Sequence, residues 1–258
     1  MPRIARQKSE SGIYHIMLRG ANRQQIFHED EDNIMFLEIL KRYKKKAGII
    51  VLGWCLMGNH IHLLLIEGKE DISLTMKRIG VSFVWHYNLK YGTTGHLFQD
   101  RFKSEEVESD EYLLTVIRYI HQNPVKAEIV KRAEEWKWSS CLGYYGGKVY
   151  PENLLDNEII LKIFSKDSQL AIKSFKNFNE SYNNDTCLDF DDVKIRLSDE
   201  DCRQEILRQI GDIKIPQIKS LPKEKRDELL RRIKGLEGIN QRQAARLLGV
   251  SQTLISRA

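Results

Sequence analysis

The chain has 258 residues, of which 41% are hydrophobic, and a formal net charge of +5 at pH 7. This length and composition allow one large domain with a sizeable core and a smaller one, and they exclude a chain that is disordered throughout. The four cysteines include no Cys-x-x-Cys pair, so neither a disulfide framework nor a zinc ribbon is indicated. The apolar run at residues 13–18 is too short for a signal peptide or a membrane span. We therefore expect a soluble, cytoplasmic protein without a membrane partner.

The charge is unevenly distributed along the chain. Residues 1–150 carry a net charge of +4, residues 151–230 carry −4 and residues 231–258 carry +5. A basic first part and a strongly basic end suit two surfaces that bind a polyanion. Many basic faces are merely solvated, so the charge alone does not identify a partner.

The first predicted elements are a strand and a helix. Residues 14–18 alternate as a strand does and lead into a turn that carries Arg19 and Arg23. These arginines either contact phosphates or decorate a loop. A helix then begins at Asp30, which can serve as its N-cap, and the lysines of residues 41–46 suit the C-terminal end of its dipole.

The next two predicted strands carry a candidate site. Residues 49–56 and 63–66 are apolar and strand-forming, and the Gly-Asn break between them predicts a tight turn. His60 and His62 open the second strand, and because side chains alternate along a strand, both imidazoles lie on one face. Such a pair can hold a metal ion or a phosphate. An isolated His-x-His is more often two unrelated polar residues at a strand end.

A second helix is predicted at residues 71–91, with an apolar face and a face on which basic and aromatic residues alternate. The second face carries Lys77, Arg78, Trp85, His86 and Lys90. It could grip a single strand by charge and base stacking, or it could be a solvated basic face with a partly buried tryptophan. Residues 97–107 predict a fourth strand with Arg101 and Lys103 on one face.

A third helix is predicted from about Asp110, which can cap it, to Asn123, where Pro124 forces an end or a kink. Tyr119 and Asn123 lie one turn apart on one face of this helix. Pro124 also suits the first position of a short following helix with Asn123 as its cap, which would give Asn123 a purely structural role.

The predicted order of strand, helix, strand, strand, helix, strand and helix indicates an α+β fold. We expect a ferredoxin-like (split β-α-β) antiparallel sheet with helices on one face and one added helix. Residues 136–145 are aromatic-rich and are expected to close a domain of residues 1–150. Residues 151–220 are expected to form a helical linker region, in which the polar residues 179–192 are a loop.

Residues 221–258 predict an all-α, C-terminal helix-turn-helix domain. Ala245 precedes Gly249 by four positions, and Ser251 can cap the following helix. An amphipathic helical hairpin is the alternative, but the joint placement of small, glycine and apolar residues favours a reader of duplex DNA through Gln252 and Arg257. The sequence ends within that last helix, so we expect either that a few residues are missing or that DNA contacts are limited to this short stretch.

The candidate site would combine two imidazoles, one phenol and one amide oxygen if the third helix packs behind the sheet near His60 and His62. Imidazole nitrogens with a neutral oxygen ligand suit Mg²⁺ or Mn²⁺ on a phosphate, and Zn²⁺ is also allowed. Tyrosine, with a pKa of about 10, is a poor nucleophile at neutral pH unless a metal ion polarises the phosphate that it attacks. The product would be a covalent phosphotyrosine, which conserves the phosphodiester energy so that the strand can be rejoined.

Four ordered motifs resemble one family of enzymes. They are Met57-Gly58-Asn59-His60-Ile61-His62-Leu63-Leu64, Leu97-Phe98-Gln99-Asp100-Arg101-Phe102-Lys103, Arg118-Tyr119-Ile120-His121-Gln122-Asn123-Pro124-Val125-Lys126-Ala127 and Trp136-Lys137-Trp138-Ser139-Ser140. The set is similar to that of the single-tyrosine HUH transposases, specifically the REP-associated tyrosine transposases, over about residues 10–145. The resemblance implies a metal-dependent endonuclease that cleaves and rejoins single-stranded DNA near hairpin-forming repeats, and thus acts in DNA transposition and recombination.

By position, the resemblance also implies roles for individual residues. His60 and His62 would bind Mg²⁺ or Mn²⁺, and Tyr119 would be the nucleophile. Asn123 would be the third metal ligand, at a position where Gln is the alternative in related enzymes. Tyr112 is the rival nucleophile, but no Asn follows it at the same spacing.

Single-stranded and hairpin DNA are the expected partners of the first domain, which would bind them through Arg19, Arg23, Arg101 and Lys103. We expect the protein to be associated with the nucleoid, and a homodimer is one possible oligomeric state. Two other functions were weighed. A histidine-triad nucleotide hydrolase is disfavoured because Leu64 stands at the third alternate position. A non-catalytic, hairpin-DNA-binding regulator of transposase ancestry also fits the sequence, and metal-dependent strand cleavage would distinguish it from the enzyme.

Overall fold

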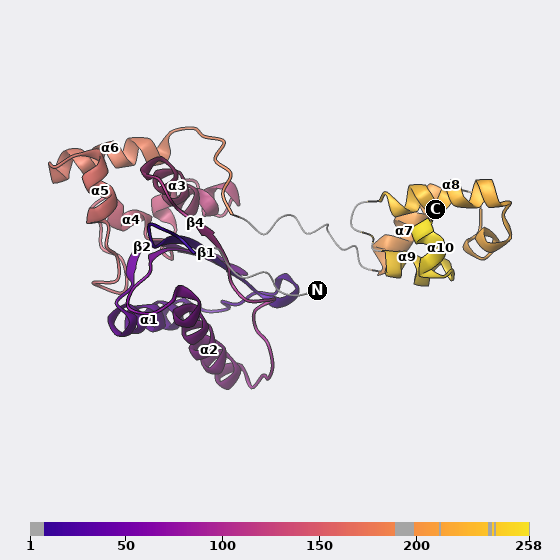
Figure 1. Ribbon diagram of the computed structural model, residues 1–258, viewed down its shortest axis with the longest axis horizontal. Helices are drawn as coiled ribbons and strands as arrows, with labels where there is room; N and C mark the ends of the chain where they lie inside the picture. The colour runs from indigo at the N-terminus through magenta and orange to yellow at the C-terminus, as the bar shows by residue number, and fades with distance from the viewer. Residues whose placement is uncertain (1–7, 189–198, 212, 237–238, 240, 258) are drawn as a thin grey trace. The chain divides into compact units, whose positions relative to one another are not determined.

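The computed structural model describes residues 8–188, 199–211, 213–236, 239 and 241–257. The chain divides into two compact units, Met1–Asp189 and Phe190–Ala258, which are labelled by element in Figure 1. None of the described helices is long and apolar enough to cross a membrane.

The first unit is built on a four-stranded antiparallel sheet with the order β2-β3-β1-β4. The strands are β1 Ile13–Arg19, β2 Ile50–Leu56, β3 His60–Ile66 and β4 Lys103–Glu106. β1 pairs with β3 along its whole length, so that Arg19 lies opposite His60. The predicted α+β class and antiparallel sheet are confirmed, and the order of the elements is that of a split β-α-β unit.

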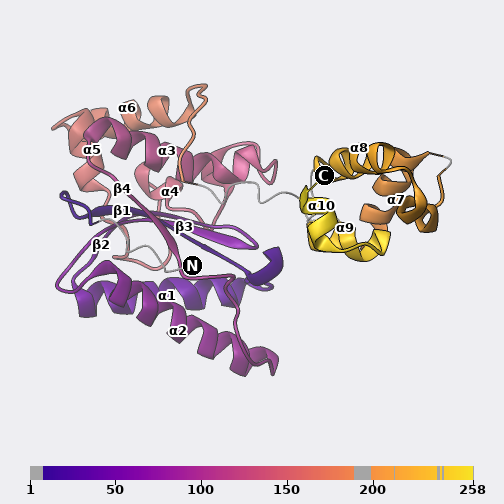
Figure 2. The ribbon, with the colours of Figure 1, turned by 45° about the vertical axis from the view of Figure 1, so that its right-hand side comes forward.

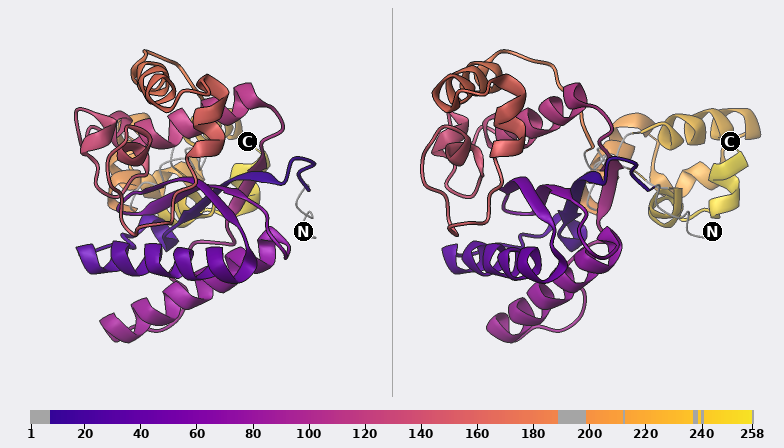
Figure 3. Two further views of the ribbon diagram at one scale, coloured as in Figure 1. Left: turned by 90° about the vertical axis from the view of Figure 1, so that its left-hand side faces the viewer. Right: turned by 60° about the vertical axis from the view of Figure 1, so that its left-hand side comes forward.

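Helices cover both faces of this sheet, and the prediction that they lie on one face is wrong. α1 Asp30–Ala47 and α2 Ile72–Tyr91 cover one face. The other face is covered by α3 Asp110–Lys126, with α4 Cys141–Tyr144, α5 Glu158–Phe164 and α6 Ser168–Glu180 around it (Figure 2). Figure 3 shows the same layers from two further directions. The reason is that the central strands are apolar on both sides. Trp54 packs in the core under α1 and α2, and the next residue, Cys55, packs in the core under α3.

Local sequence explains where α1 begins and ends. The Asp32 carboxylate accepts hydrogen bonds from the backbone N–H groups of His28 (2.8 Å) and Glu29 (3.0 Å). The helix therefore starts at Asp30 as predicted, but Glu29 is its N-cap. It ends at Gly48, whose φ of 70° is left-handed and favours glycine.

The helix α3 differs from its prediction at both ends. Ser109 rather than Asp110 is its N-cap, and the Ser109 hydroxyl accepts a hydrogen bond from the first turn. The helix also continues through Pro124, because a proline in the last turn removes only one intrahelical hydrogen bond. The carbonyl of Asn123 accepts a hydrogen bond from the N–H of Ala127, so Asn123 lies inside α3 and does not cap a second helix.

Only the last part of the predicted fourth strand joins the sheet. The residues before β4 instead bond to the turn after β1, where Ala21 N–H donates to the carbonyl of Leu97 (2.8 Å) and Gln99 N–H donates to the carbonyl of Arg19 (2.9 Å). That turn contains the 3-10 helix η1 Ala21–Arg23. Arg101 therefore lies outside the sheet.

The segment after α3 closes the first unit along β2. It contains the 3-10 helix η2 Ala133–Glu135. The Trp136 indole N–H donates to the carbonyl of Leu56 (3.0 Å), and a backbone bridge joins Cys55 to Ser139. The edge of the sheet is thus covered by the aromatic segment that the sequence assigns to this role.

The second unit is entirely helical in its described residues. Its elements are α7 Asp199–Ile210, η3 Ile215–Ser220, α8 Lys223–Lys234, α9 Gln241–Leu248 and α10 Gln252–Arg257. A turn at Gly249, with a φ of 64°, joins α9 to α10, and Val250 N–H donates to the carbonyl of Ala245 (2.9 Å). This is a helical hairpin with the predicted spacing, and its role as a DNA reader stays a prediction.

The two units divide the chain differently from the predicted boundaries at residues 150 and 220. Ile160 and Phe175 are fully buried in the core around α3, so α5 and α6 are part of the first unit rather than of a linker. Cys202 and Ile206 are fully buried in the core of the second unit. The apolar faces of these helices determine which unit they belong to.

Candidate active site

The two histidines of the motif lie at the start of β3 with their ring centroids 5.0 Å apart. Strand alternation directs both toward the face that α3 covers. His62 is fully buried, whereas His60 is partly exposed.

The hydrogen bonds of Asn59 determine how His60 is oriented. The Asn59 amide nitrogen donates to the carbonyl of Arg23 (3.4 Å), which leaves its oxygen 2.7 Å from His60 Nδ1. In the neutral imidazole the proton is therefore on Nδ1, by assignment from the network. The bare Nε2 then faces the side-chain oxygen of Asn123 at 3.3 Å. In this tautomer His60 Nε2 and the Asn123 oxygen both present lone pairs, and a cation bound between them would be coordinated by both atoms.

His62 is held by a histidine on the neighbouring strand. His15 is fully buried, and its Nε2 lies 3.1 Å from His62 Nδ1. His15 Nδ1 lies 3.9 Å from Glu105 Oε2, an ion-pair distance rather than a hydrogen bond. If the proton of His15 is on Nδ1, the nitrogen that faces Glu105, then His15 Nε2 can accept a hydrogen bond from the Nδ1–H of His62.

The remaining nitrogen of His62 is available as a ligand. His62 Nε2 is buried and has no hydrogen-bond partner among the described residues. Burial, and then the neighbouring imidazoles of His15 and His60, lower the pKa of His62 well below its ordinary value of 6.5. The ring is therefore neutral at neutral pH, which is the form that binds metal ions.

Tyr119 and Asn123 approach these histidines from α3. The Tyr119 ring is 6% exposed, and its centroid lies 5.7 Å from that of His62 and 6.1 Å from that of His15. Lys126 Nζ lies 4.8 Å from the centroid of the Tyr119 ring. The structure thus brings together the four residues that the sequence predicts as catalytic or metal-binding.

The donor set can be tested against a metal ion. No three His, Cys, Asp or Glu side chains gather at a metal-binding distance within the described part of the chain. A metal ion here would use His60 Nε2, the buried His62 Nε2 and the Asn123 oxygen, with open positions for phosphate and water. The buried His62 Nε2, which has no hydrogen-bond partner among the described residues, fits that group. A mixed nitrogen and oxygen set binds Mg²⁺ or Mn²⁺ less tightly than Zn²⁺.

The rival nucleophile, Tyr112, lies in a different environment. Burial, and then a hydrogen bond to Glu105, raise the pKa of Tyr112 above its ordinary value. Its phenol also contacts Cys187. A phenol that is harder to ionise and already bonded to a carboxylate is a poorer nucleophile than one beside two imidazoles.

His15 and Lys126 were not predicted as site residues. His15 is 47 positions from His62 in the sequence, and only the antiparallel register of β1 and β3 makes them neighbours. The alternation of residues 13–19 could have identified His15 if that register had been assumed. Lys126 lies seven positions after Tyr119, two turns along α3, which is a spacing that the helix period does predict.

Two predicted DNA-binding arginines lie at the turn that presents His60. Arg19 ends β1 directly opposite His60. The next residue, Gly20, donates its N–H to the carbonyl of Asn59 (2.9 Å), and the carbonyl of Arg23 accepts the Asn59 amide. These arginines therefore border the histidine pair.

The other predicted DNA-binding residues lie on other elements. Lys103 lies on β4, opposite Met17 of β1, and Arg101 is exposed in the loop before it. Gln252 and Arg257 are exposed on α10, in the second unit. The structure thus gathers part of the predicted set around the site and leaves the rest on other surfaces.

Comparisons with known proteins found a matching family model, a similar sequence and a similar solved structure. Residues 8–123, from the start of the described chain to the end of the site, match the family described as "Transposase IS200 like". A REP-associated tyrosine transposase of Escherichia coli (strain K12) is 24% identical over 119 residues, which are 45% of this chain and 69% of the relative. A solved structure of a REP-associated tyrosine transposase bound to a REP hairpin matches with a TM-score of 0.48 and 22% identity, over 58% of this chain and 89% of that one.

Proposed function

Since residues 8–123 match the model of the IS200-like transposase family, we propose that this chain is a member of it and cleaves and rejoins single-stranded DNA beside hairpin-forming repeats, through a covalent phosphotyrosine at Tyr119. One observation carries the proposal, namely the convergence of His60, His62, Tyr119 and Asn123 from β3 and α3. The REP-associated relative in Escherichia coli supports repeats as the DNA substrate.

The reaction is a transesterification at phosphorus. The phenolic oxygen of Tyr119 attacks a phosphodiester, a tyrosine O–P bond forms, and the P–O bond to one strand end breaks. The phenol loses its proton, and the departing oxygen gains one and becomes a free hydroxyl. The reverse attack by a strand-end hydroxyl rejoins DNA and releases Tyr119, so no external energy source is needed.

A divalent metal ion, Mg²⁺ or Mn²⁺, would be held by His60, His62 and Asn123. When bound, it supplies Lewis-acid polarisation of the phosphate and stabilises negative charge on the departing oxygen. Asn59 and His15 orient the two imidazoles so that each presents Nε2 to this position. Lys126 Nζ lies 4.8 Å from the centroid of the Tyr119 ring, within cation–π distance.

A non-catalytic, hairpin-binding regulator is the second candidate, and the burial of Tyr119 favours it. Tyr119 is 6% exposed, so little of this residue is open to a phosphate in the structure. A regulator would use the same basic turn around Arg19 and Arg23 to bind the hairpin and would leave the strand intact.

The second unit is assigned to duplex DNA. Its turn at Gly249 holds α9 and α10 as a helix-turn-helix would, and Gln252 and Arg257 are exposed on the second helix. Cleavage of single-stranded DNA by the first unit and binding of duplex DNA by the second would both act on chromosomal DNA. They would place the protein in the cytoplasm, at the nucleoid.

The test is a covalent adduct. The full chain is incubated with Mg²⁺ or Mn²⁺ and end-labelled single-stranded hairpin oligonucleotides from the repeats of the source genome, and the products are separated on a denaturing gel. We expect a labelled protein band that disappears with Tyr119→Phe or with chelator and persists with Tyr112→Phe, a matched change on the same helix. Tight hairpin binding without any adduct would support the regulator instead.

A further inference from the structure

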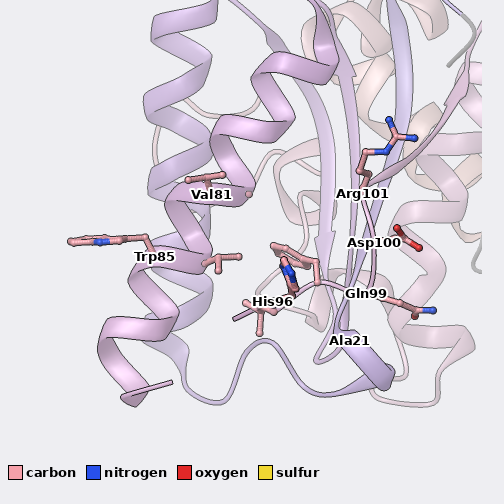
Figure 4. A pocket seen from close by; sticks show the side chains of 11 residues that line it. Ala21, Val81, Trp85, His96, Gln99, Asp100 and Arg101 are labelled. Atoms are coloured by element: carbon pink, nitrogen blue, oxygen red, sulfur yellow. The ribbon is translucent and has the colours of Figure 1, made fainter. Parts of the chain in front are cut away.

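An open pocket of about 820 Å³ lies in the first unit between α2 and the segment that follows it. Its walls are one side of α2, from Gly80 to Trp85, residues 96–101 and Ala21 (Figure 4). This volume is within the range of about 300–1,000 Å³ that is typical of pockets for small organic groups. The reaction proposed above does not use this pocket.

The lining combines apolar surface with a polar rim. Val81 and Trp85 are 63% and 68% exposed, which is high for large apolar side chains. The rim carries hydrogen-bonding groups from His96, Gln99 and Arg101. In Figure 4 the Trp85 indole extends outward from α2, on the side of the helix away from His96, Gln99 and Arg101. Exposed aromatic surface beside donors and acceptors suits a flat heteroaromatic ring, such as a nucleobase.

The backbone connects this pocket to the candidate active site. Ala21 donates its N–H to Leu97, and Gly20 donates its N–H to the carbonyl of Asn59, the residue that orients His60. The pocket lies on the face of the sheet that α2 covers, and the turn after β1 connects its lining to the histidine pair, which faces α3.

The charge on α2 also points to bases rather than phosphates. Lys90 is paired with Asp32 (2.8 Å) and Glu29 (3.0 Å), and Arg78 is paired with Glu70. These two cations of the predicted basic face are thus engaged within the protein, whereas Lys77 of the same face is exposed and does not line the pocket. What α2 offers beside the pocket is chiefly aromatic and apolar surface.

We propose that this pocket binds unpaired nucleobases of the DNA strand, with one base stacked on Trp85 and a neighbouring base hydrogen-bonded at the rim, and thereby positions the strand for Tyr119. The inference rests on the proposed function, because it is that function which supplies a single strand. Since stacking is tolerant of base identity, Trp85 contributes affinity for any base, and Gln99 and Arg101 contribute preference among bases.

The test compares strands with and without bases. Binding of the full chain to a fluorescein-labelled 20-nucleotide thymidine strand is measured by anisotropy in chelator, which prevents cleavage, and again with an abasic strand of equal length. We expect Trp85→Ala to weaken binding of the thymidine strand about 5- to 150-fold and to leave binding of the abasic strand unchanged. Trp85→Phe should retain most of the affinity. Leu89→Ala is the matched control, because Leu89 is 69% exposed on the same helix and does not line the pocket.

The outcomes separate this inference from the function on which it rests. Equal affinity of Trp85→Ala and the unchanged chain for the thymidine strand overturns the inference, even where the Tyr119 adduct forms. Affinity that depends on Trp85 without any adduct supports the pocket and argues against the enzyme. A change of oligomeric state in Trp85→Ala, with DNA binding unchanged, would identify the pocket as a contact between two copies of the chain and overturn the proposal.

Discussion

His15 is the residue whose change tests the candidate metal site most selectively. It is fully buried, and its Nε2 lies 3.1 Å from His62 Nδ1. We predict that His15→Gln weakens Mn²⁺ binding about 10- to 100-fold, because the His62 ring loses the partner that fixes its tautomer and orientation. Calorimetric titration of the DNA-free protein with Mn²⁺ measures this without any cleavage assay.

A second buried histidine provides the control for that experiment. His121 is fully buried on α3 and lies with Nε2 2.9 Å from the Ser140 hydroxyl, and burial lowers its pKa to about 3. His121→Gln should destabilise the fold and leave Mn²⁺ affinity unchanged. If both variants lowered the affinity equally, the effect of His15 would be general destabilisation.

The sequence predicts part of this site because of local periodicity. Alternation on one strand gives the shared face of His60 and His62, and helical spacing gives the shared face of Tyr119 and Asn123. The partnership of His15 with His62 depends on which strand lies beside β3, and no local pattern contains that information. Contacts within one element were thus predictable, and contacts between strands were not.

The fit of α3 against the sheet depends on a glycine in β2. A Cβ atom at Gly53 would lie 2.3 Å from Ile117 Cδ1 of α3, which is too short a distance for two nonbonded carbon atoms. We predict that Gly53→Ala destabilises the protein by about 1–3 kcal/mol, because the helix or the Ile117 side chain must shift. Chemical denaturation measures the change in the free energy of unfolding.

A second substitution distinguishes local crowding from other effects of the alanine. Ile117→Val removes the Cδ1 atom and should restore most of the stability in the double variant. Tyr119 lies two residues after Ile117 on α3, so the amount of covalent adduct should be reduced in Gly53→Ala. It should recover in the double variant together with the stability. A double variant no more stable than Gly53→Ala would show that crowding is not the cause.

The contact between α1 and α2 predicts an acid-sensitive stability. The buried Asp32 carboxylate accepts hydrogen bonds from Lys90 (2.8 Å) and Tyr91 (2.7 Å). Burial raises its pKa, but the hydrogen bonds from Lys90, His28, Tyr91 and Glu29 outweigh it, so the pKa of Asp32 is below its ordinary value of 3.8. The unfolded chain then binds more protons than the folded one as the pH falls below about 4, and the folded state loses stability.

Replacing the carboxylate should remove that dependence. Asp32→Asn should destabilise the protein by about 1–3 kcal/mol at neutral pH and make the free energy of unfolding less dependent on pH below 4. The exposed Asp100→Asn should behave as the unchanged chain does. Parallel slopes for the unchanged chain and Asp32→Asn would contradict the assignment.

The element level also shows why the layering was mispredicted. The run Leu63, Leu64, Leu65 is fully buried on alternating faces of β3, so both faces of the sheet require cover. A continuous apolar strand of this kind indicates burial on both sides, in contrast to the alternation of a half-exposed strand. The order of the elements was predictable because each has its own period, but the face that each helix covers depends on tertiary packing.

At the scale of the whole molecule, the two units should contribute separable binding activities. We predict that Arg257→Ala reduces the salt dependence of duplex DNA binding by about one unit of slope, because one phosphate contact is lost. Adduct formation on single-stranded hairpins should be unchanged. Anisotropy titrations of a labelled duplex over a range of salt concentrations measure the slope.

Arg203→Ala is the matched control, because Arg203 is exposed on α7 of the same unit and outside the helical hairpin. An equal loss of slope in Arg203→Ala would show that binding depends on the general charge of the unit. The division into units could be predicted only in outline, because the amphipathic helices α5 and α6 have the same sequence character whether they pack on α3 or form a linker.

The helix that carries the proposed nucleophile is also attached to the last described segment of the first unit. Arg118 donates to both carboxylate oxygens of Asp185 (2.6 and 3.0 Å), and Lys126 donates to the Asp185 carbonyl (3.1 Å). Gln122, midway between them on the same side of α3, donates to the carbonyl of Asn179 (2.6 Å). Through these bonds, a displacement of residues 179–185 would be transmitted to α3 and hence to Tyr119.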